Sequence, residues 1–222
     1  MTNFKKGFTL AEVLITLAII GVVSALTVPG LMNSYQKQTY VTQLHKVYNE
    51  MSQALTQYKT DRNALNLKEA GLTSDANVQS FIETYFKVVN KCDTVTSPCF
   101  ANVSEYKNLA GTSATSVISA NVKSYVLASG AAIRPLLNIE GDKLINLGVD
   151  INGAKGPNIL GRDLFFFGIY NNGLIDDFND SSTNAPLSTT IRETLFTKCQ
   201  SGTSSGWGCF GKILNDNWQM TY

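Results

Sequence analysis

Histidine is almost absent from this chain, and its scarcity removes several kinds of catalytic site. The 222 residues include one histidine, His45. A metal site with several histidines, or a pair of catalytic histidines, therefore cannot be built within one chain. The phosphate-binding pattern Gly-x-x-x-x-Gly-Lys-Ser/Thr is also missing. We therefore expect no enzyme activity.

Charge is also scarce, and it is balanced. Charged residues make up 16% of the chain, with 18 Lys+Arg against 17 Asp+Glu. Two of the basic residues, Lys5 and Lys6, lie in the first seven positions, and without that stretch the balance is 16 to 17. No basic field of the kind that binds nucleic acid is left. Nucleic-acid binding is not predicted, unless the chain belongs to a DNA-uptake filament.

The four cysteines form two pairs that are close in sequence, Cys92 with Cys99 and Cys199 with Cys209. The gaps are wider than the knuckles of a structural zinc site. An even number of cysteines at short spacing favours two local disulfides in an oxidising compartment. The sequence therefore predicts that this part of the chain is exported.

One long apolar run is present at residues 8–28, and Glu12 is its one charge. A helix of this length spans about 31 Å, which matches the apolar core of a bilayer. Lys5 and Lys6 precede it, and positive residues remain on the cytoplasmic side. We therefore predict a transmembrane helix with the rest of the chain outside the cytoplasm.

Two interpretations of this N-terminus compete. In the first, it is a signal peptide cut at Val23-Ser24-Ala25, which releases a secreted domain that begins at Leu26. That interpretation leaves Glu12 unexplained, because an acid inside an apolar helix is costly. The second starts from the sequence KKGFTLAEVLI at residues 5–15, which resembles the type IV prepilin family of pilins and secretion pseudopilins. The resemblance implies cleavage after Gly7 and N-methylation of Phe8.

The resemblance also implies roles for Glu12 and Pro29. In the family the acid neutralises the N-terminal amine of a neighbouring subunit, and here that amine would be on Phe8. Pro29 removes one helix hydrogen bond and crowds the preceding turn, so it would loosen or kink the helix. Both residues are expected to serve assembly.

The resemblance implies an α+β pilin fold, with a long N-terminal helix packed on an antiparallel sheet. We expect a leader at 1–7, a transmembrane helix at 8–28, an amphipathic stem at 29–63 and a globular head at 64–222. The stem has apolar residues three and four positions apart, which indicates one packing face. These residues are Val41, Leu44, Tyr48, Met51, Leu55 and Tyr58.

The head shows helix patterns first and strand patterns later. Helices are predicted at 75–91, with Asp75 as the N-cap, and at 187–199. A sheet of about four strands is expected from short apolar runs. These runs lie at 117–118, 125–127, 132–133, 144–151 and 164–170. The tail at 209–222 is expected to add a final strand at the sheet edge through Ile213, Trp218 and Met220.

The segment VDINGAKGPNILGRD at 149–163 is rich in turn residues. Its oxygen-bearing side chains, Asp150, Asn152, Asn158 and Asp163, could bind calcium, which prefers oxygen ligands. Alternatively, these side chains cap the backbone of a structural hairpin. The spacing does not match an EF-hand, so the sequence leaves both interpretations open. No other cofactor is expected, and Asp176, Asp177 and Asp180 form a weaker acidic cluster.

The function expected from the resemblance is structural: a subunit, minor by the size of its head, of a type IV pilus or type II secretion pseudopilus. The implied partners are prepilin peptidase and methylase, other pilin subunits, and the inner-membrane assembly platform with its ATPase. The subunit would reside in the cytoplasmic (inner) membrane with its head exported, and the fibre in the periplasm or at the cell surface. The alternatives are a membrane-anchored binding protein or adhesin, and the secreted domain described above.

Overall fold

The computed structural model describes residues 7–93, 97–114, 118, 122–178 and 184–222. Most of the predicted leader, the candidate strand position Val117 and the acidic residue Asp180 lie outside these residues. The chain forms two compact units, Met1–Thr39 and Tyr40–Tyr222. The buried residues of the described chain all belong to the second unit. The predicted domain boundaries stay a prediction.

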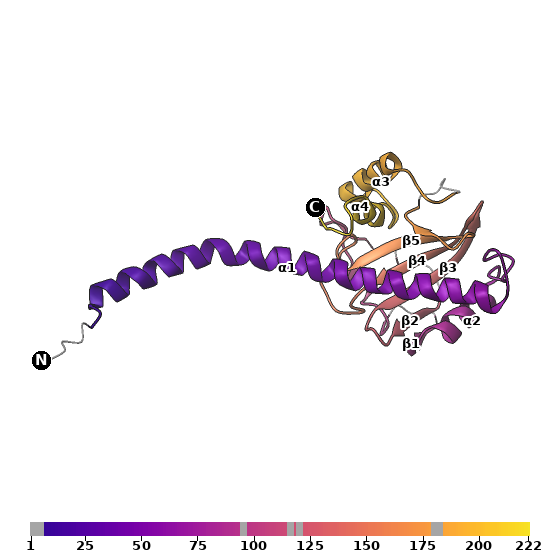
Figure 1. Cartoon of the computed structure of the whole chain (residues 1–222), viewed down its shortest axis with the longest axis horizontal. Helices are drawn as coiled ribbons and strands as arrows, with labels where there is room; N and C mark the ends of the chain where they lie inside the picture. The colour runs from indigo at the N-terminus through magenta and orange to yellow at the C-terminus, as the bar shows by residue number, and fades with distance from the viewer. Residues whose placement is uncertain (1–6, 94–96, 115–117, 119–121, 179–183) are drawn as a thin grey trace, which may run out of the picture. The chain divides into compact units, whose positions relative to one another are not determined.

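Helix α1 covers Leu10–Asp61 (Figure 1) and includes Pro29. Proline has no N–H to donate to the carbonyl of Ala25, four residues earlier, so one backbone hydrogen bond is missing there. The predicted kink stays a prediction. From Tyr40 onward one face of the helix is buried, as expected from the periodicity. The buried residues are Val41, Leu44, Val47, Met51, Ala54, Leu55 and Tyr58. The predicted Tyr48 is only half-buried.

The head contains a six-stranded antiparallel sheet in the order β1-β2-β3-β4-β5-β6. The strands are β1 (Val88–Cys92), β2 (Ser124–Leu127), β3 (Ala132–Glu140), β4 (Lys143–Asp150), β5 (Leu164–Tyr170) and β6 (Ile175–Asp176). The predicted α+β class is confirmed, and the arrangement is consistent with a pilin fold. The predicted number of strands was too low, because β1 and β6 were not recognised.

Helix α2 covers Asp75–Tyr85 and is shorter than predicted. Its N-cap is Ser74, whose hydroxyl accepts a hydrogen bond from the N–H of Asn77 at 3.2 Å, so the assignment of Asp75 as the cap was wrong. The helix ends because Phe86 is extended, with φ −119° and ψ 147°. The following residues form β1, since they pair with β2. The predicted helix therefore combined a helix and a strand, both of which carry apolar residues.

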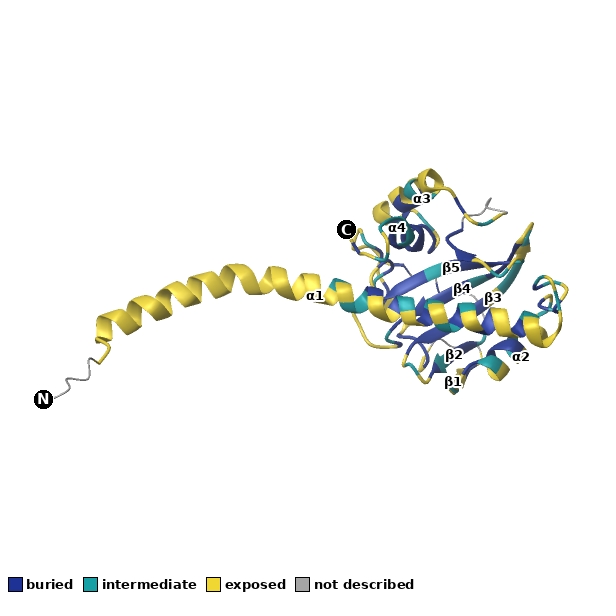
Figure 2. Cartoon of the chain, viewed as in Figure 1, coloured by how far each residue is buried: buried dark blue, intermediate teal, exposed yellow. Residues whose placement is uncertain are grey.

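The C-terminal region folds into α3 (Thr189–Ser201) and α4 (Cys209–Asn215). The short 3-10 helix η1 (Val103–Glu105) lies between β1 and β2 in the chain. The late helix is confirmed, two residues beyond its predicted position. The predicted final strand is wrong, because its first half forms α4, which packs against α3 and contacts β5. Helices α1, α2 and α4 and the sheet share one apolar core (Figure 2).

Two disulfides join Cys92 to Cys99 and Cys199 to Cys209, with Cα atoms 6.2 and 5.6 Å apart. The predicted pairing is confirmed. The second bond links the end of α3 to the start of α4.

Removing the second bond is expected to destabilise the head. Replacing both Cys199 and Cys209 with serine should lower the free energy of unfolding by about 2–3 kcal/mol, because the unfolded loop regains its freedom. Urea unfolding of the variant and of the unchanged chain measures this difference. Reductant should lower the midpoint less in the variant, which has only the bond between Cys92 and Cys99 left to lose. An unchanged midpoint would show that the packing of α3 on α4 is sufficient alone.

Candidate functional site

Helix α1 begins with reciprocal hydrogen bonds between Thr9 and Glu12. The Thr9 hydroxyl accepts from the N–H of Glu12 at 3.2 Å. The Glu12 carboxylate accepts from the N–H of Thr9 at 2.8 Å and from its hydroxyl at 2.9 Å. This arrangement is a capping box, in which two otherwise unpaired N–H groups at a helix start find acceptors. The acid therefore has local partners from its own chain.

The expectation for Glu12 did not include the capping box, although its signal, Thr-x-x-Glu before an apolar run, is present at residues 9–12. The expectation concerned the amine of Phe8 in a neighbouring subunit. A carboxylate held by its own Thr9 is less costly to place in an apolar medium than a free one. The role of Glu12 in assembly stays a prediction.

The bond between Gly7 and Phe8 lies just before the helix, outside any regular secondary structure. Both residues are exposed, and Phe8 is 90% exposed. Apart from its two chain neighbours, no described residue comes within 4 Å of the position that a Cβ atom on Gly7 would take. An enzyme can therefore reach this peptide bond without displacing other parts of the described chain. Lys5 and Lys6 lie outside the described residues.

The first part of α1 exposes apolar side chains on every side (Figure 2). Every residue from 7 to 36 is exposed. Among the described residues, α1 is the helix that is long and apolar enough to cross a membrane, and its most apolar stretch is entirely exposed. A helix that is apolar all round is stable only in a large core or in a membrane. The described chain offers no such core around this segment.

A family model described as the prokaryotic N-terminal methylation motif matches residues 2–28. The chain carries this motif. The match covers Gly7, Phe8 and Glu12, together with the whole predicted transmembrane segment at 8–28. The resemblance to the prepilin family is therefore confirmed for the N-terminus of the chain.

Curated proteins that are similar to this chain are named as components of secretion and fimbrial systems. The type II secretion system core protein G of Aeromonas hydrophila is 33% identical over 73 residues, which are 33% of this chain and 50% of that protein. The protein of the same name from Escherichia coli is 36% identical over 76 residues, 33% of this chain and 50% of that protein. The type IV major fimbrial protein FimA of Dichelobacter nodosus is 38% identical over 71 residues, 32% of this chain and 42% of that protein.

This chain therefore spans about half the length of the curated relatives that it matches. No solved structure shows significant similarity to it. The apolar helix and these relatives together indicate membrane anchoring with an exported head.

In the head, the predicted loop brings its oxygen-bearing residues together between β4 and β5. Asp163 accepts hydrogen bonds from the N–H groups of Asn158 and Ile159 at 2.7 and 2.6 Å. Asp150 accepts from the hydroxyl of Tyr106 at 2.7 Å and from the N–H of Asn152 at 3.2 Å. These bonds support the structural interpretation, in which the side chains fix the turns of the loop.

The same loop also has the features of a cation site. Asp150 and Asp163 are both fully buried, and neither forms an ion pair among the described residues. Burial raises the pKa of Asp150 to about 8. The charge of Asp163 adds to the rise, and the hydrogen bond from Tyr106 opposes it. The side-chain carbonyl oxygens of Asn152 and Asn158 are buried and have no hydrogen-bond partner. Oxygen atoms of these four residues fit the preferences of calcium.

In the second acidic cluster, Asp176 and Asp177 bind other elements of the head. Asp176 binds Arg192 through two hydrogen bonds of 2.9 and 2.6 Å, which fixes β6 to α3. Asp177 is fully buried and accepts from the N–H groups of Gly208 and Gly211, at 2.8 and 2.6 Å, at the start of α4. These contacts explain why the tail forms a helix. The bonds of Asp177 have no local signal in the sequence, because their partners are more than 30 residues apart.

His45 lies on α1, where its ring stacks on Trp218 at a centroid distance of 4.0 Å. The sequence also contains a Gly-x-Ser-x-Gly pattern at Gly202–Gly206. In a nucleophile elbow this pattern joins a strand to a helix, whereas here it follows helix α3. Neither feature forms a catalytic arrangement among the described residues.

Proposed function

We propose that this chain is a structural subunit of a type IV pilus or type II secretion pseudopilus. Prepilin peptidase would cut after Gly7, a methylase would modify the new N-terminus at Phe8, and the apolar helix would then pack with other subunits. The observation that carries the proposal is the methylation motif. Its match includes Glu12, which caps the start of α1, and the apolar part of α1 that is exposed on all sides. The names of the relatives support it.

The same proposal gives the subunit its location and partners. It resides in the cytoplasmic membrane through α1 with its head exported, and enters a fibre in the periplasm or at the cell surface. Its partners are the prepilin peptidase and methylase, other pilin or pseudopilin subunits, and the membrane platform with its ATPase. The chain is a substrate of enzymes in this scheme and not itself an enzyme, and the near-neutral charge of residues 8–222 does not favour nucleic acid as a partner.

The proposal is tested by the intact mass and N-terminal sequence of the protein from native membranes. A chain that begins at N-methylated Phe8, recovered with fibres sheared from cells, is the expected result. A chain that begins at Leu26 in the soluble exported fraction would replace the proposal with a secreted domain. A processed chain that never enters fibres and whose head binds a surface ligand would favour a membrane-anchored adhesin.

Calcium binding by the loop at 150–163 is a second part of the proposal. Support comes from two buried carboxylates and two unpartnered amide oxygens within one short loop. The ion would supply a positive partner for Asp150 and Asp163, which form no ion pair among the described residues, and would hold the connection between β4 and β5.

Calcium is expected to stabilise the protein after treatment with a chelator. At a concentration one hundred times the dissociation constant, the gain is about 2.7 kcal/mol. Replacing Asn158 with glycine should remove this gain, since glycine tolerates the φ of 57° at this position but offers no side-chain oxygen. Thermal unfolding with calcium, magnesium or chelator measures the effect. Identical midpoints in calcium and chelator would leave the loop as a structural hairpin.

A further inference from the structure

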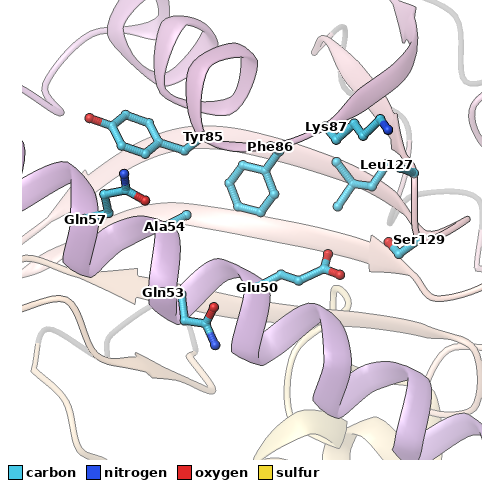
Figure 3. Close-up of a pocket in the computed structure, with 10 residues that line it drawn as sticks. Glu50, Gln53, Ala54, Gln57, Tyr85, Phe86, Lys87, Leu127 and Ser129 are labelled. Atoms are coloured by element: carbon cyan, nitrogen blue, oxygen red, sulfur yellow. The ribbon is translucent and has the colours of Figure 1, made fainter.

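A groove of about 260 Å³ lies between α1 and the part of the head where α2 leads into β1 (Figure 3). Its apolar lining includes Ala54, Phe86 and Leu127, which are all buried. Ser129, in the turn after β2, also lines the groove. Small-molecule sites usually have volumes of about 300–1,000 Å³. The groove is therefore closer in size to a single long side chain than to a small-molecule ligand.

The stem contributes a polar stripe to this groove. Glu50, Gln53 and Gln57 are three and four residues apart, so they lie on one face of α1. In the described part of the chain, none of these three side chains takes part in a hydrogen bond or an ion pair. By contrast, Glu83, Glu140 and Glu193 each pair with a lysine. These three side chains therefore offer oxygen acceptors that nothing in the described part of the chain uses.

Glu50 is the charged group that faces the interior of the groove. Figure 3 shows its carboxylate extending from α1 toward the side where Leu127 and Ser129 lie. The ammonium end of Lys87, which also lines the groove, points away from Glu50. The groove thus combines an apolar floor with the free carboxylate of Glu50 and the side-chain oxygens of Gln53 and Gln57.

A lysine side chain complements these features. Its methylene stem suits an apolar floor, and its ammonium group donates up to three hydrogen bonds. Pairing with a partly shielded carboxylate is stronger than pairing in open solvent. An anionic guest would face the charge of Glu50, and an apolar guest would leave the acceptors unpaired.

The chain itself presents a suitable lysine. Lys155 lies in the loop between β4 and β5, within the four exposed residues 154–157, and forms no ion pair among the described residues. The loop is held in shape by the bonds of Asp163 and by one from the Asn152 amide to the carbonyl of Gly156 at 3.2 Å. A lysine on a fixed loop loses less freedom on binding than one on a mobile loop.

We propose that this groove in one copy of the chain takes the Lys155 side chain of a second copy, with Glu50 as the partner of its ammonium group. The inference rests on the proposed function, because it needs copies that are neighbours in one assembly. A subunit that contacts its own copies is repeated along the fibre. Confirmation would therefore replace the expectation, drawn from the size of the head, that the subunit is minor.

The test uses the full chain in its native host, with a photo-crosslinking amino acid in place of Gln53 at the edge of the groove. The expected product is a covalent dimer in which the adduct maps to the loop around Lys155. The charge reversals E50K and K155E should each lower the dimer yield about five-fold, as expected for loss of one ion pair. The double variant E50K/K155E should restore it. The matched control K107E changes another exposed lysine of the head and should have no effect.

Three outcomes would overturn the inference: no dimer, an adduct at another surface, or a dimer that the charge reversals leave unchanged. The N-terminus and the fibre content are measured in the same samples, which separates this inference from the proposed function. A chain that begins at Phe8 and enters fibres without the dimer overturns only the groove contact. A chain that is not processed and forms no fibres overturns both.

Discussion

The variant Glu12→Gln is expected to be cut after Gly7 as usual but to enter fibres at least about ten-fold less than the unchanged chain, the loss that about 1.4 kcal/mol represents. Glutamine retains the capping box, because the motif accepts Glu or Gln at this position. It cannot, however, neutralise the amine of Phe8 in a neighbouring subunit. The change therefore separates the charge of Glu12 from its part in the helix start. Fibres sheared from cells, compared with processed subunit in membranes, give the measurement.

A matched variant at Thr9 removes the other half of the arrangement. Thr9→Val leaves the carboxylate of Glu12 in place but removes its hydroxyl donor and the N-cap, which costs about 0.5–2 kcal/mol of helix stability. We expect a smaller loss of assembly than for Glu12→Gln. If Thr9→Val is the more severe of the two, or if both variants assemble normally, the charge of Glu12 is not the feature that assembly requires.

The largest loss of head stability is expected from Asp177→Ala. This change leaves the N–H groups of Gly208 and Gly211, buried at the start of α4, without an acceptor. The cost is about 3–5 kcal/mol, since several buried donors lose their partner together. Urea unfolding of the soluble fragment 40–222, which includes the buried residues of the described chain, measures it. The exposed Asp142 is the matched control, and its alanine variant should unfold like the unchanged fragment.

The variant Asp177→Asn tests the charge of the same group. Burial raises the pKa of Asp177 from 3.8 to about 7, while hydrogen bonds from backbone N–H groups oppose the rise. Between these two values the folded head holds a proton that the unfolded chain has released, so the contribution of Asp177 to stability falls as the pH rises. Asparagine does not titrate. The stability deficit of Asp177→Asn should therefore shrink from pH 3.8 to about 7. A constant or growing deficit would contradict the raised pKa.

The parts of the chain that could be predicted are those with a local signal. The membrane segment and the cleavage motif are continuous in sequence, and the buried face of the stem follows one helical period. Strands β4 and β5 are apolar runs bounded by turns, so they were found nearly to the residue. The cysteine pairs were correct because each pair closes a short loop.

The errors come from contacts between distant residues. Val88–Cys92 continues the apolar pattern of α2, and only its pairing with β2 makes it a strand. The tail becomes a helix because Asp177 binds the N–H groups at its start. The groove could not be foreseen either, because Glu50 lies on the polar side of a predicted stem and gives no sign of which elements flank it. The capping box is different, since Thr9 and Glu12 are only three positions apart and the pattern could have been recognised.

The strand order has a consequence for how the head is made. Every strand pairs with the strand that precedes it in the chain, so no strand has to wait for a later partner. The N-terminal strands of the exported head emerge from the membrane first, so such a sheet can grow by one strand at a time. Helix α4 is the last helix or strand to emerge, and its Cys209 completes the bond with Cys199. A chain truncated before α4 would therefore keep its sheet order but lose the bond between Cys199 and Cys209, and it would expose the residues of β5 that α4 contacts to quality-control proteases.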